Sequence, residues 1–251
     1  MKDRNFDDLA DRFASRIYGG SKGAIRQAVI QRDLEEIGVF DTPPSRMLDA
    51  GGGFGWVAQQ LAPLGTEATV VDISPNMLAI GQAQWRDSQQ TGQIDWQVQS
   101  IQETTGTYPL VCCHAVLEWV EEPERVLSHL CSLVEEGGYL SLMVFNEVAL
   151  IWKHVLYGRI HKAISGDIQG FGNTLTPNHA FTIEQMNGWL AKRGMTVEIV
   201  SGVRVFHDYM NPTVRNKLWT DQESFLELEL KYSRDVVHQR MARYLHFLIK
   251  G

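Results

Sequence analysis

The chain has 251 residues, of which 44% are hydrophobic, and this is enough for a sizeable buried core in one large domain or in one domain with an appended lobe. It contains no apolar run of about eighteen residues, and its charged first residues lack the apolar core of a signal peptide. We therefore expect neither a membrane-spanning nor a secreted protein, and the expected location is the cytoplasm.

The net charge of −7, taken as a whole, argues against a nucleic-acid partner, but the charge is unevenly distributed. Residues 47–149 hold two basic and thirteen acidic side chains, whereas residues 150–251 hold thirteen basic and nine acidic ones. A solvated surface that keeps the protein in solution would explain the acidic middle. Alternatively, the flanking parts of the chain face an anionic partner.

Residues 1–44 predict a helical lead-in to the main domain. The segment "YGGSKG" at residues 18–23 interrupts it, and Ser21 is a candidate cap for a helix over residues 22–38.

Residues 45–251 form the predicted main domain, which begins with short apolar runs that alternate with amphipathic segments. The runs predict buried strands at residues 45–50, 67–73, 94–99, 109–116 and 138–145. Helices are predicted between them at residues 55–64, 75–90 and 122–136. This alternation indicates an α/β fold with a mostly parallel sheet and helices on both faces, in which ligands bind at the carboxyl ends of the strands.

The rest of the chain adds an insertion and two further strands. The insertion, rich in glycine and asparagine, covers about residues 146–180 and is followed by predicted helices at 182–194 and 222–234. Strands at residues 195–206 and 242–250 suit an antiparallel pair that closes the edge of the sheet, which brings the predicted total to seven strands.

The three cysteines, Cys112, Cys113 and Cys131, lie in apolar sequence without the spacing of metal ligands. We expect reduced core residues rather than a disulfide framework, and no metal site.

The loop after the first strand is rich in glycine. Asp49 ends the strand, and Gly51, Gly53 and Gly55 follow at every second position. A dinucleotide-binding loop would need its third glycine where Trp56 stands, so a nicotinamide dehydrogenase is disfavoured. The stretch resembles motif I of the class I S-adenosylmethionine-dependent methyltransferases, in which glycines let the main chain lie against the cofactor. The resemblance implies a Rossmann-like fold with S-adenosyl-L-methionine as cofactor.

Further residues match this superfamily at the ends of the next strands. Asp72 stands where a carboxylate accepts the ribose hydroxyls, although it also suits a helix cap or turn before "SPNM". Ile101 and Gln102 stand where family members pack the adenine ring and bond its edge. His114 ends the fourth strand, facing the cofactor cleft, and is equally well explained as a core histidine.

The residues expected of several methyl acceptors are missing. The place after the fourth strand reads "HAVLE" instead of the Asn/Asp-Pro-Pro motif of adenine methyltransferases, and Cys112 and Cys113 lie inside a predicted buried strand. The sequence contains no histidine and acid at a spacing that would predict a general base for a hydroxyl acceptor.

Several segments closely resemble the bacterial tRNA 5-carboxymethoxyuridine methyltransferases. They are residues 3–29, the motif "MLDAGGGFG", "CHAVLEWV" at residues 113–120 and "GVRVFHDYM" at residues 202–210. The resemblance implies esterification of the carboxymethoxy group on the wobble uridine of tRNA. It further implies that Arg26 binds the methionine carboxylate of the cofactor, and that Gly51, Gly52, Asp72, Ile101 and His114 complete the cofactor site.

A carboxylate acceptor is already ionised at neutral pH, so it needs orienting groups rather than a general base. We hypothesise that these groups are Tyr18, Lys22, Arg204, His207 and Tyr209. Arg204 as an edge-strand charge and Tyr209 as a packing residue are the alternatives. Phosphates of an anticodon stem-loop would meet the basic residues Lys153, Arg159, Lys162, Lys192, Arg193, Arg215 and Lys217, and a splayed base would stack on an aromatic side chain such as Trp152 or Tyr157.

Three other functions fit parts of the sequence. A small-molecule carboxylate or hydroxyl methyltransferase would use the same fold, as would a protein that binds S-adenosylmethionine without catalysis. The carboxy-S-adenosylmethionine enzymes also share the fold, although "GVRVFHDY" favours the esterifying enzyme. The sequence predicts no oligomeric state.

Overall fold

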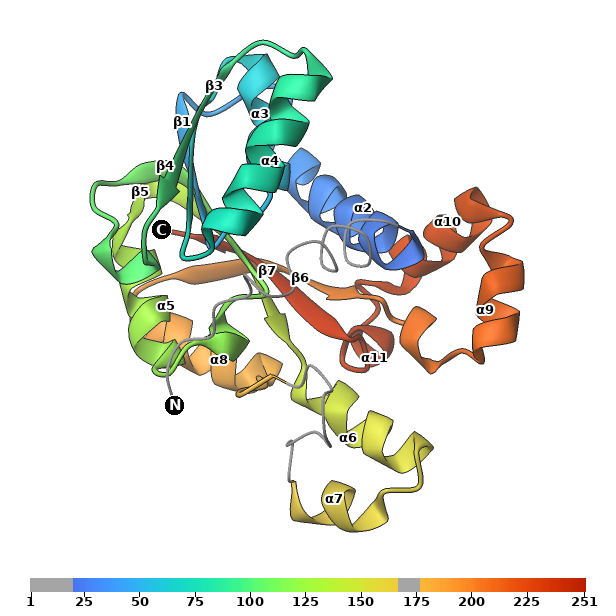
Figure 1. Cartoon of the computed structure of the whole chain (residues 1–251). Coiled ribbons are helices and arrows are strands. Elements are labelled where there is room, and N and C mark those ends of the chain that lie inside the picture. Colours follow the sequence, from blue (N-terminus) through green and yellow to red (C-terminus); the bar gives the residue numbers. More distant parts are fainter. Residues whose placement is uncertain (1–19, 167–176) are drawn as a thin grey trace.

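The computed structural model describes residues 20–166 and 177–251, which contain a seven-stranded sheet with the order β3-β2-β1-β4-β5-β7-β6 (Figure 1). Strands β1 to β5 pair in parallel, whereas β7 runs antiparallel to both β5 and β6. The bounds are β1 Arg46–Ala50, β2 Glu67–Asp72, β3 Gln93–Val98, β4 Tyr108–His114, β5 Val134–Phe145, β6 Thr196–Val203 and β7 Tyr244–Lys250. The predicted α/β fold is confirmed, with β6 at the edge and the antiparallel strand β7 inside it.

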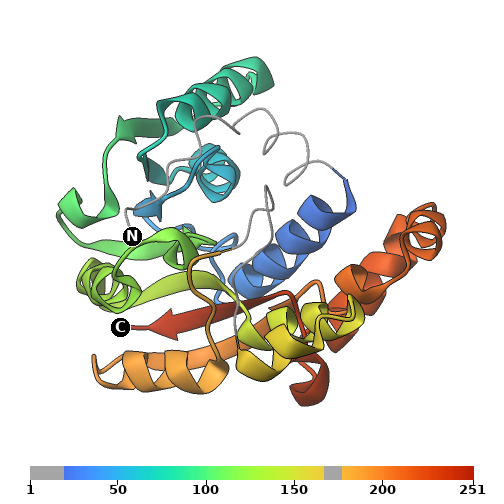
Figure 2. The ribbon, with the colours of Figure 1, turned by 60° about the horizontal axis from the view of Figure 1, so that its bottom comes forward.

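Helices cover both faces of the sheet and divide the core in two. Helices α2 (Ser21–Glu36), α3 (Trp56–Leu61) and α4 (Pro75–Ser88) pack on one face. Helices α5 (Pro123–Ser132) and α8 (Ile183–Ala191) pack on the other, as the two views show (Figure 2). Because the central strands are covered on both sides, β1 is buried from Met47 to Ala50, which explains its continuous apolar run.

The remaining helices lie near the edge that β6 and β7 form or project from the carboxyl end of β5. Helices α6 and α7 extend from the body of the molecule, whereas α10 packs against α2, with α9 next to it (Figure 1). Their bounds are α6 Glu147–Leu156, α7 Ile160–Ser165, α9 Pro212–Leu218, α10 Gln222–Tyr232 and α11 Val236–Gln239. Short 3-10 helices cover Ala62–Leu64, Ile101–Glu103, Leu117–Trp119 and His207–Tyr209.

Three local predictions are wrong. The strand predicted as buried at residues 94–99 is the edge strand β3, in which no residue is buried, because only one neighbouring strand pairs with it. The helix predicted over residues 122–136 ends at Ser132, because Val134 already pairs with Tyr108 as the start of β5. Ser21 does not cap α2. Gly20 occupies the cap position, and the Ser21 hydroxyl lies 2.8 Å from Nε2 of His207 instead.

Other features bear on the division of the chain and its environment. Helix α2 contributes Val29, Ile30 and Leu34 to the core on its face, while a domain boundary at residue 44 stays a prediction. Cys112 and Cys113 are buried in β4 as expected, and all three cysteines are free. Within residues 20–166 and 177–251, no helix has the length and hydropathy of a membrane span.

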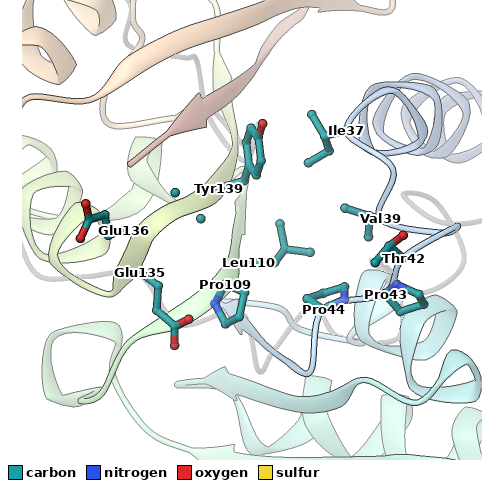
Figure 3. Close-up of a pocket in the computed structure, with 12 residues that line it drawn as sticks. Ile37, Val39, Thr42, Pro43, Pro44, Pro109, Leu110, Glu135, Glu136 and Tyr139 are labelled. Atoms are coloured by element: carbon teal, nitrogen blue, oxygen red, sulfur yellow. The ribbon is translucent and has the colours of Figure 1, made fainter.

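A hollow lies at the amino-terminal ends of the parallel strands (Figure 3). Pro44, Pro109 and Tyr139 line it, and Glu135 at its rim forms an ion pair of 2.7 Å with Arg46. Because the glycine loop follows the carboxyl end of β1, this hollow belongs to the opposite edge of the sheet.

Candidate active site

The glycine loop turns sharply at the carboxyl end of β1. Gly51, Gly53 and Gly55 have φ angles of +66°, +56° and +63°, a conformation that other residues rarely adopt. Gly52 is required for a different reason, since a Cβ atom there would lie 2.6 Å from Cγ of Asp49. The alternation seen in the sequence therefore follows from backbone geometry and close packing.

Asp72 ties this loop to the end of β2. Its Oδ2 accepts a hydrogen bond from the Gly53 N–H at 2.9 Å, and its Oδ1 accepts one from the Ser74 N–H at 2.8 Å. Ser74, rather than Asp72, caps α4 by accepting from the Met77 N–H. The carboxylate thus borders the glycine loop and holds the turn before α4, which was its alternative role, while its contact with the ribose stays a prediction.

A pocket beside the loop brings together residues from distant parts of the sequence. Arg26 and Gln27 come from α2, Trp56 begins α3, and His114 ends β4; the other lining residues are Ile30, Asp49, Gly51, Gly52 and Val57. Five of the predicted cofactor residues, Arg26, Asp49, Gly51, Gly52 and His114, therefore line one pocket. Ile101 is buried in the 3-10 helix after β3, and Gln102 is exposed beside it.

Burial sets the protonation of two groups in this pocket. It raises the pKa of Asp49 to about 7, and the negative charge of Asp72 adds to the effect. Burial also lowers the pKa of His114 well below its usual range, so the ring is neutral near pH 7. His114 contacts Ser141 at 2.9 Å while lining the pocket, and its role at the cofactor stays a prediction.

A second group of side chains, the basic cluster, consists of Lys22, Lys153, Arg204 and Arg243. All four interact electrostatically with Asp208, whose Oδ2 lies 3.1 Å from Nε of Arg204. Desolvation is the largest cause that lowers the pKa values of Lys22, Lys153 and Arg243, and their mutual repulsion lowers them further. Four cations around one acid form a partly desolvated region with excess positive charge, which suits an anionic ligand.

Helix α10 holds the turn that carries part of the basic cluster. The buried carboxylate of Glu229 accepts hydrogen bonds from three successive backbone N–H groups, those of Val205, Phe206 and His207. The preceding residue, Arg204, has φ +62° and is only 8% exposed. The sequence shows Glu229 as one acid in an amphipathic helix, so its role as the anchor of this turn was missed.

The five residues predicted to orient the acceptor have different environments. Lys22 and Arg204 lie in the basic cluster, whereas Tyr18 lies outside the described residues. The His207 ring is 1% exposed and faces Ser21 on one side and Asp208 on the other, at 2.8 and 3.5 Å. The Tyr209 hydroxyl donates to the Met241 carbonyl. These two side chains therefore support the turn.

Arg243 is the basic residue that sequence reasoning missed. Its backbone N–H donates to the Arg204 carbonyl at 3.2 Å, immediately beyond the β6–β7 pair Val203 and Tyr244. The register of the predicted antiparallel pair would have placed the two arginines together.

Tyr244 joins the pocket to the basic cluster. The guanidinium carbons of Arg26 and Arg204 lie 5.4 and 5.1 Å from the centroid of its ring. The pocket and the excess positive charge are therefore neighbours at the same edge of the sheet.

Similarity to known proteins agrees with this arrangement. A family model described as a methyltransferase domain matches residues 23–199. The tRNA 5-carboxymethoxyuridine methyltransferase of Escherichia coli K12 is 35% identical over 98% of this chain and 95% of its own length. The chain belongs to this methyltransferase family. A more distant relative is the ubiquinone biosynthesis O-methyltransferase of Xanthomonas axonopodis pv. citri, which is 26% identical to this methyltransferase. That match covers 63% of this chain and 66% of the relative.

Solved structures confirm the fold of this methyltransferase. The magnesium protoporphyrin IX methyltransferase of Synechocystis, solved with bound SAH, superposes with a TM-score of 0.67 at 17% identity. The match covers 98% of this chain and 95% of that one. The predicted class I methyltransferase fold is thus observed over nearly the whole length.

Proposed function

We propose that this methyltransferase transfers a methyl group from S-adenosyl-L-methionine to the carboxylate of 5-carboxymethoxyuridine at the wobble position of tRNA, giving the methyl ester. The observation that carries this proposal is the contiguity of the glycine-loop pocket and the basic cluster through Tyr244. One region suits the cofactor, and the adjoining one suits an anionic acceptor.

The pocket residues fit S-adenosylmethionine. The loop is built so closely against its neighbours that only glycine fits, since a Cβ atom on Gly51 would lie 2.6 Å from Cγ2 of Val116. Arg26 would hold the methionine carboxylate and Asp72 the ribose hydroxyls, with Ile101 and Gln102 at the adenine. When bound, this cofactor supplies a methyl group on a positively charged sulfur.

The contribution of the chain to the reaction is to bind and orient a nucleophile that is already ionised. A carboxylate with an ordinary pKa needs no general base near neutral pH. The basic cluster would hold one carboxylate oxygen and leave the other directed toward the pocket, which lowers the entropic cost of reaching the reactive geometry. Arg243 and Lys153 join the predicted Lys22 and Arg204 in this role.

Helices α6 and α7 offer a surface for the anticodon stem-loop beside the basic cluster. Lys153 belongs both to α6 and to the basic cluster, and Arg159 interacts with it electrostatically. Trp152 and Tyr157 are 40% and 69% exposed on the same segment, and the guanidinium of Arg159 lies over the Tyr157 ring. Exposed aromatic rings flanked by cations suit a base stacked out of a tRNA loop.

The test is methyl transfer to tRNA from cells that lack this gene, measured by nucleoside mass spectrometry with isotopically labelled S-adenosylmethionine. The expected result is one labelled methyl on 5-carboxymethoxyuridine. Arg46→Gln, which alters the opposite edge of the sheet, is the control variant and should retain the activity. Cofactor binding without transfer to tRNA would contradict the proposal and favour a small-molecule acceptor or a non-catalytic binding protein.

A further inference from the structure

Four polar residues form a continuous line across the sheet face that α2 covers. Asp33 Oδ2 lies 2.7 Å from Nδ1 of His246, whose Nε2 lies 2.8 Å from Oγ of Ser141. The same hydroxyl lies 2.9 Å from Nε2 of His114, which lines the glycine-loop pocket. We call these four residues the relay.

The relay lies within an apolar layer. Asp33, Ser141 and His246 have no exposed surface, and Met143 pairs with both His114 and His246 in the strand register. Buried polar groups are costly unless they are hydrogen-bonded, and here each one bonds to the next. The hydrogen bonds of the relay therefore constrain one another.

The charge of Asp33 determines which ring nitrogen of His246 carries a proton. Although burial raises the pKa of Asp33, its hydrogen bond to His246, the charge of Arg32 and the hydrogen bond from Arg234 bring that pKa well below the usual range. Both arginines donate to its Oδ1 at 2.8 Å. An ionised carboxylate only accepts hydrogen bonds, so Nδ1 of His246 carries a proton.

The positions of the other protons depend on Ser141, because its hydroxyl has one hydrogen and can donate to only one of the two histidines. When His246 carries this single proton, its Nε2 has a lone pair. Ser141 then donates to His246 and accepts from Nε2–H of His114. Because the His114 ring is neutral, its Nδ1 has a lone pair.

We propose that Asp33, His246 and Ser141 are positioning residues that hold His114 with its proton on Nε2, so that Nδ1 offers an acceptor to an ammonium group bound in the pocket. The amino acid end of S-adenosylmethionine pairs an ammonium with a carboxylate, and the pocket offers Arg26 to the carboxylate. This inference rests on the cofactor assignment of the proposed function.

The first test is the protonation of the histidine nitrogens in the full chain, measured by long-range proton–nitrogen NMR with His114→Gln used for assignment. We expect a protonated Nε2 and an unprotonated Nδ1 at His114, and a protonated Nδ1 at His246. A proton on Nδ1 of His114 would overturn the proposal. This measurement does not depend on the folding of any relay variant, because it is made on the wild-type chain.

The second test is the Kd for S-adenosylmethionine, measured by calorimetry. Ser141→Ala should weaken binding about threefold to tenfold, the range expected for one hydrogen bond, and should add nothing in a His114→Asn background. Ser233→Ala is the matched control, because Ser233 is equally buried and its hydroxyl donates to the Leu230 carbonyl rather than to a residue of the relay. An unchanged Kd in Ser141→Ala overturns this inference alone, whereas a wild-type chain that binds no S-adenosylmethionine overturns the cofactor assignment as well.

Discussion

Arg26 and Arg204 share one aromatic ring, since both guanidinium groups lie over Tyr244 at 5.4 and 5.1 Å. Arg26 lines the glycine-loop pocket, and Arg204 belongs to the basic cluster. An aromatic ring in contact with two cations stabilises both positions without neutralising either charge.

Replacing Tyr244 should therefore affect both substrates. Tyr244→Leu removes the ring from both guanidinium groups, and we expect kcat/KM to fall about tenfold, with higher KM values for cofactor and tRNA. Tyr244→Phe retains the ring and should remain near wild type. Steady-state kinetics with each substrate varied in turn measure this, and an effect of Tyr244→Leu on one KM alone would contradict the bridging role.

Replacing Arg243 should lower kcat/KM for tRNA without changing the affinity for the cofactor. Arg243→Gln removes a cation from the basic cluster, so kcat/KM for tRNA should fall at least about tenfold, as expected for loss of a charge-assisted hydrogen bond. The Kd for S-adenosylmethionine should stay constant. Arg243→Lys should recover part of the activity, and a wild-type kcat/KM for Arg243→Gln would exclude the basic cluster as the carboxylate site.

Asp49 should make cofactor binding depend on pH. Its pKa in the free protein is raised to about 7 by burial and by Asp72, so near neutral pH the carboxyl is partly protonated. A cationic ligand favours the ionised form, so affinity should rise as pH increases from about 6 to 8 and then level off, with release of a proton on binding. Calorimetry in buffers of different ionisation enthalpy measures this release.

The matched variant for this prediction is Asp49→Asn. Its amide cannot ionise, so the pH dependence in that range should disappear. Persistence of the same pH dependence in Asp49→Asn would assign the titration to another group.

Substitution by alanine should have opposite effects at Gly52 and Gly188, abolishing cofactor binding at the first and stabilising the fold at the second. Gly52→Ala places a methyl group 2.6 Å from Cγ of Asp49 and 2.9 Å from Cγ1 of Val70, so cofactor binding should be lost. Gly188 lies in α8, and a Cβ atom there would meet nothing within 4 Å. Gly188→Ala should raise the free energy of unfolding by about 0.5–1 kcal/mol and leave binding intact. Thermal denaturation and calorimetry distinguish these results.

Sequence alone predicts the parts of this fold that repeat a local pattern. The apolar runs mark the inner strands, because strands covered on both faces must be continuously apolar, whereas the edge strands β3 and β6 alternate in exposure along part of their length. The glycines at 51, 53 and 55 are equally readable, since each satisfies a local backbone requirement. The segment around Val134 was misassigned because a helical pattern runs directly into a strand.

Long-range polar pairs are not predictable in this way. Ser141 and His246 lie 105 residues apart, and each is one polar residue in an apolar strand. Likewise, nothing near His207 in the sequence shows that the hydroxyl of Ser21, 186 residues away, contacts its ring. Such contacts depend on strand register and on the packing of α2, which emerge only when the sheet is assembled.

The sheet order also has a consequence for the time course of folding. In the described sheet, β6 pairs only with β7, although β7 follows it in the chain. During translation, β6 therefore has no strand to pair with until β7 has left the ribosome and paired with both β5 and β6. Because the pairing of β7 also brings Arg243, Tyr244 and His246 into place, the nascent enzyme remains inactive until this late, non-local pairing has formed.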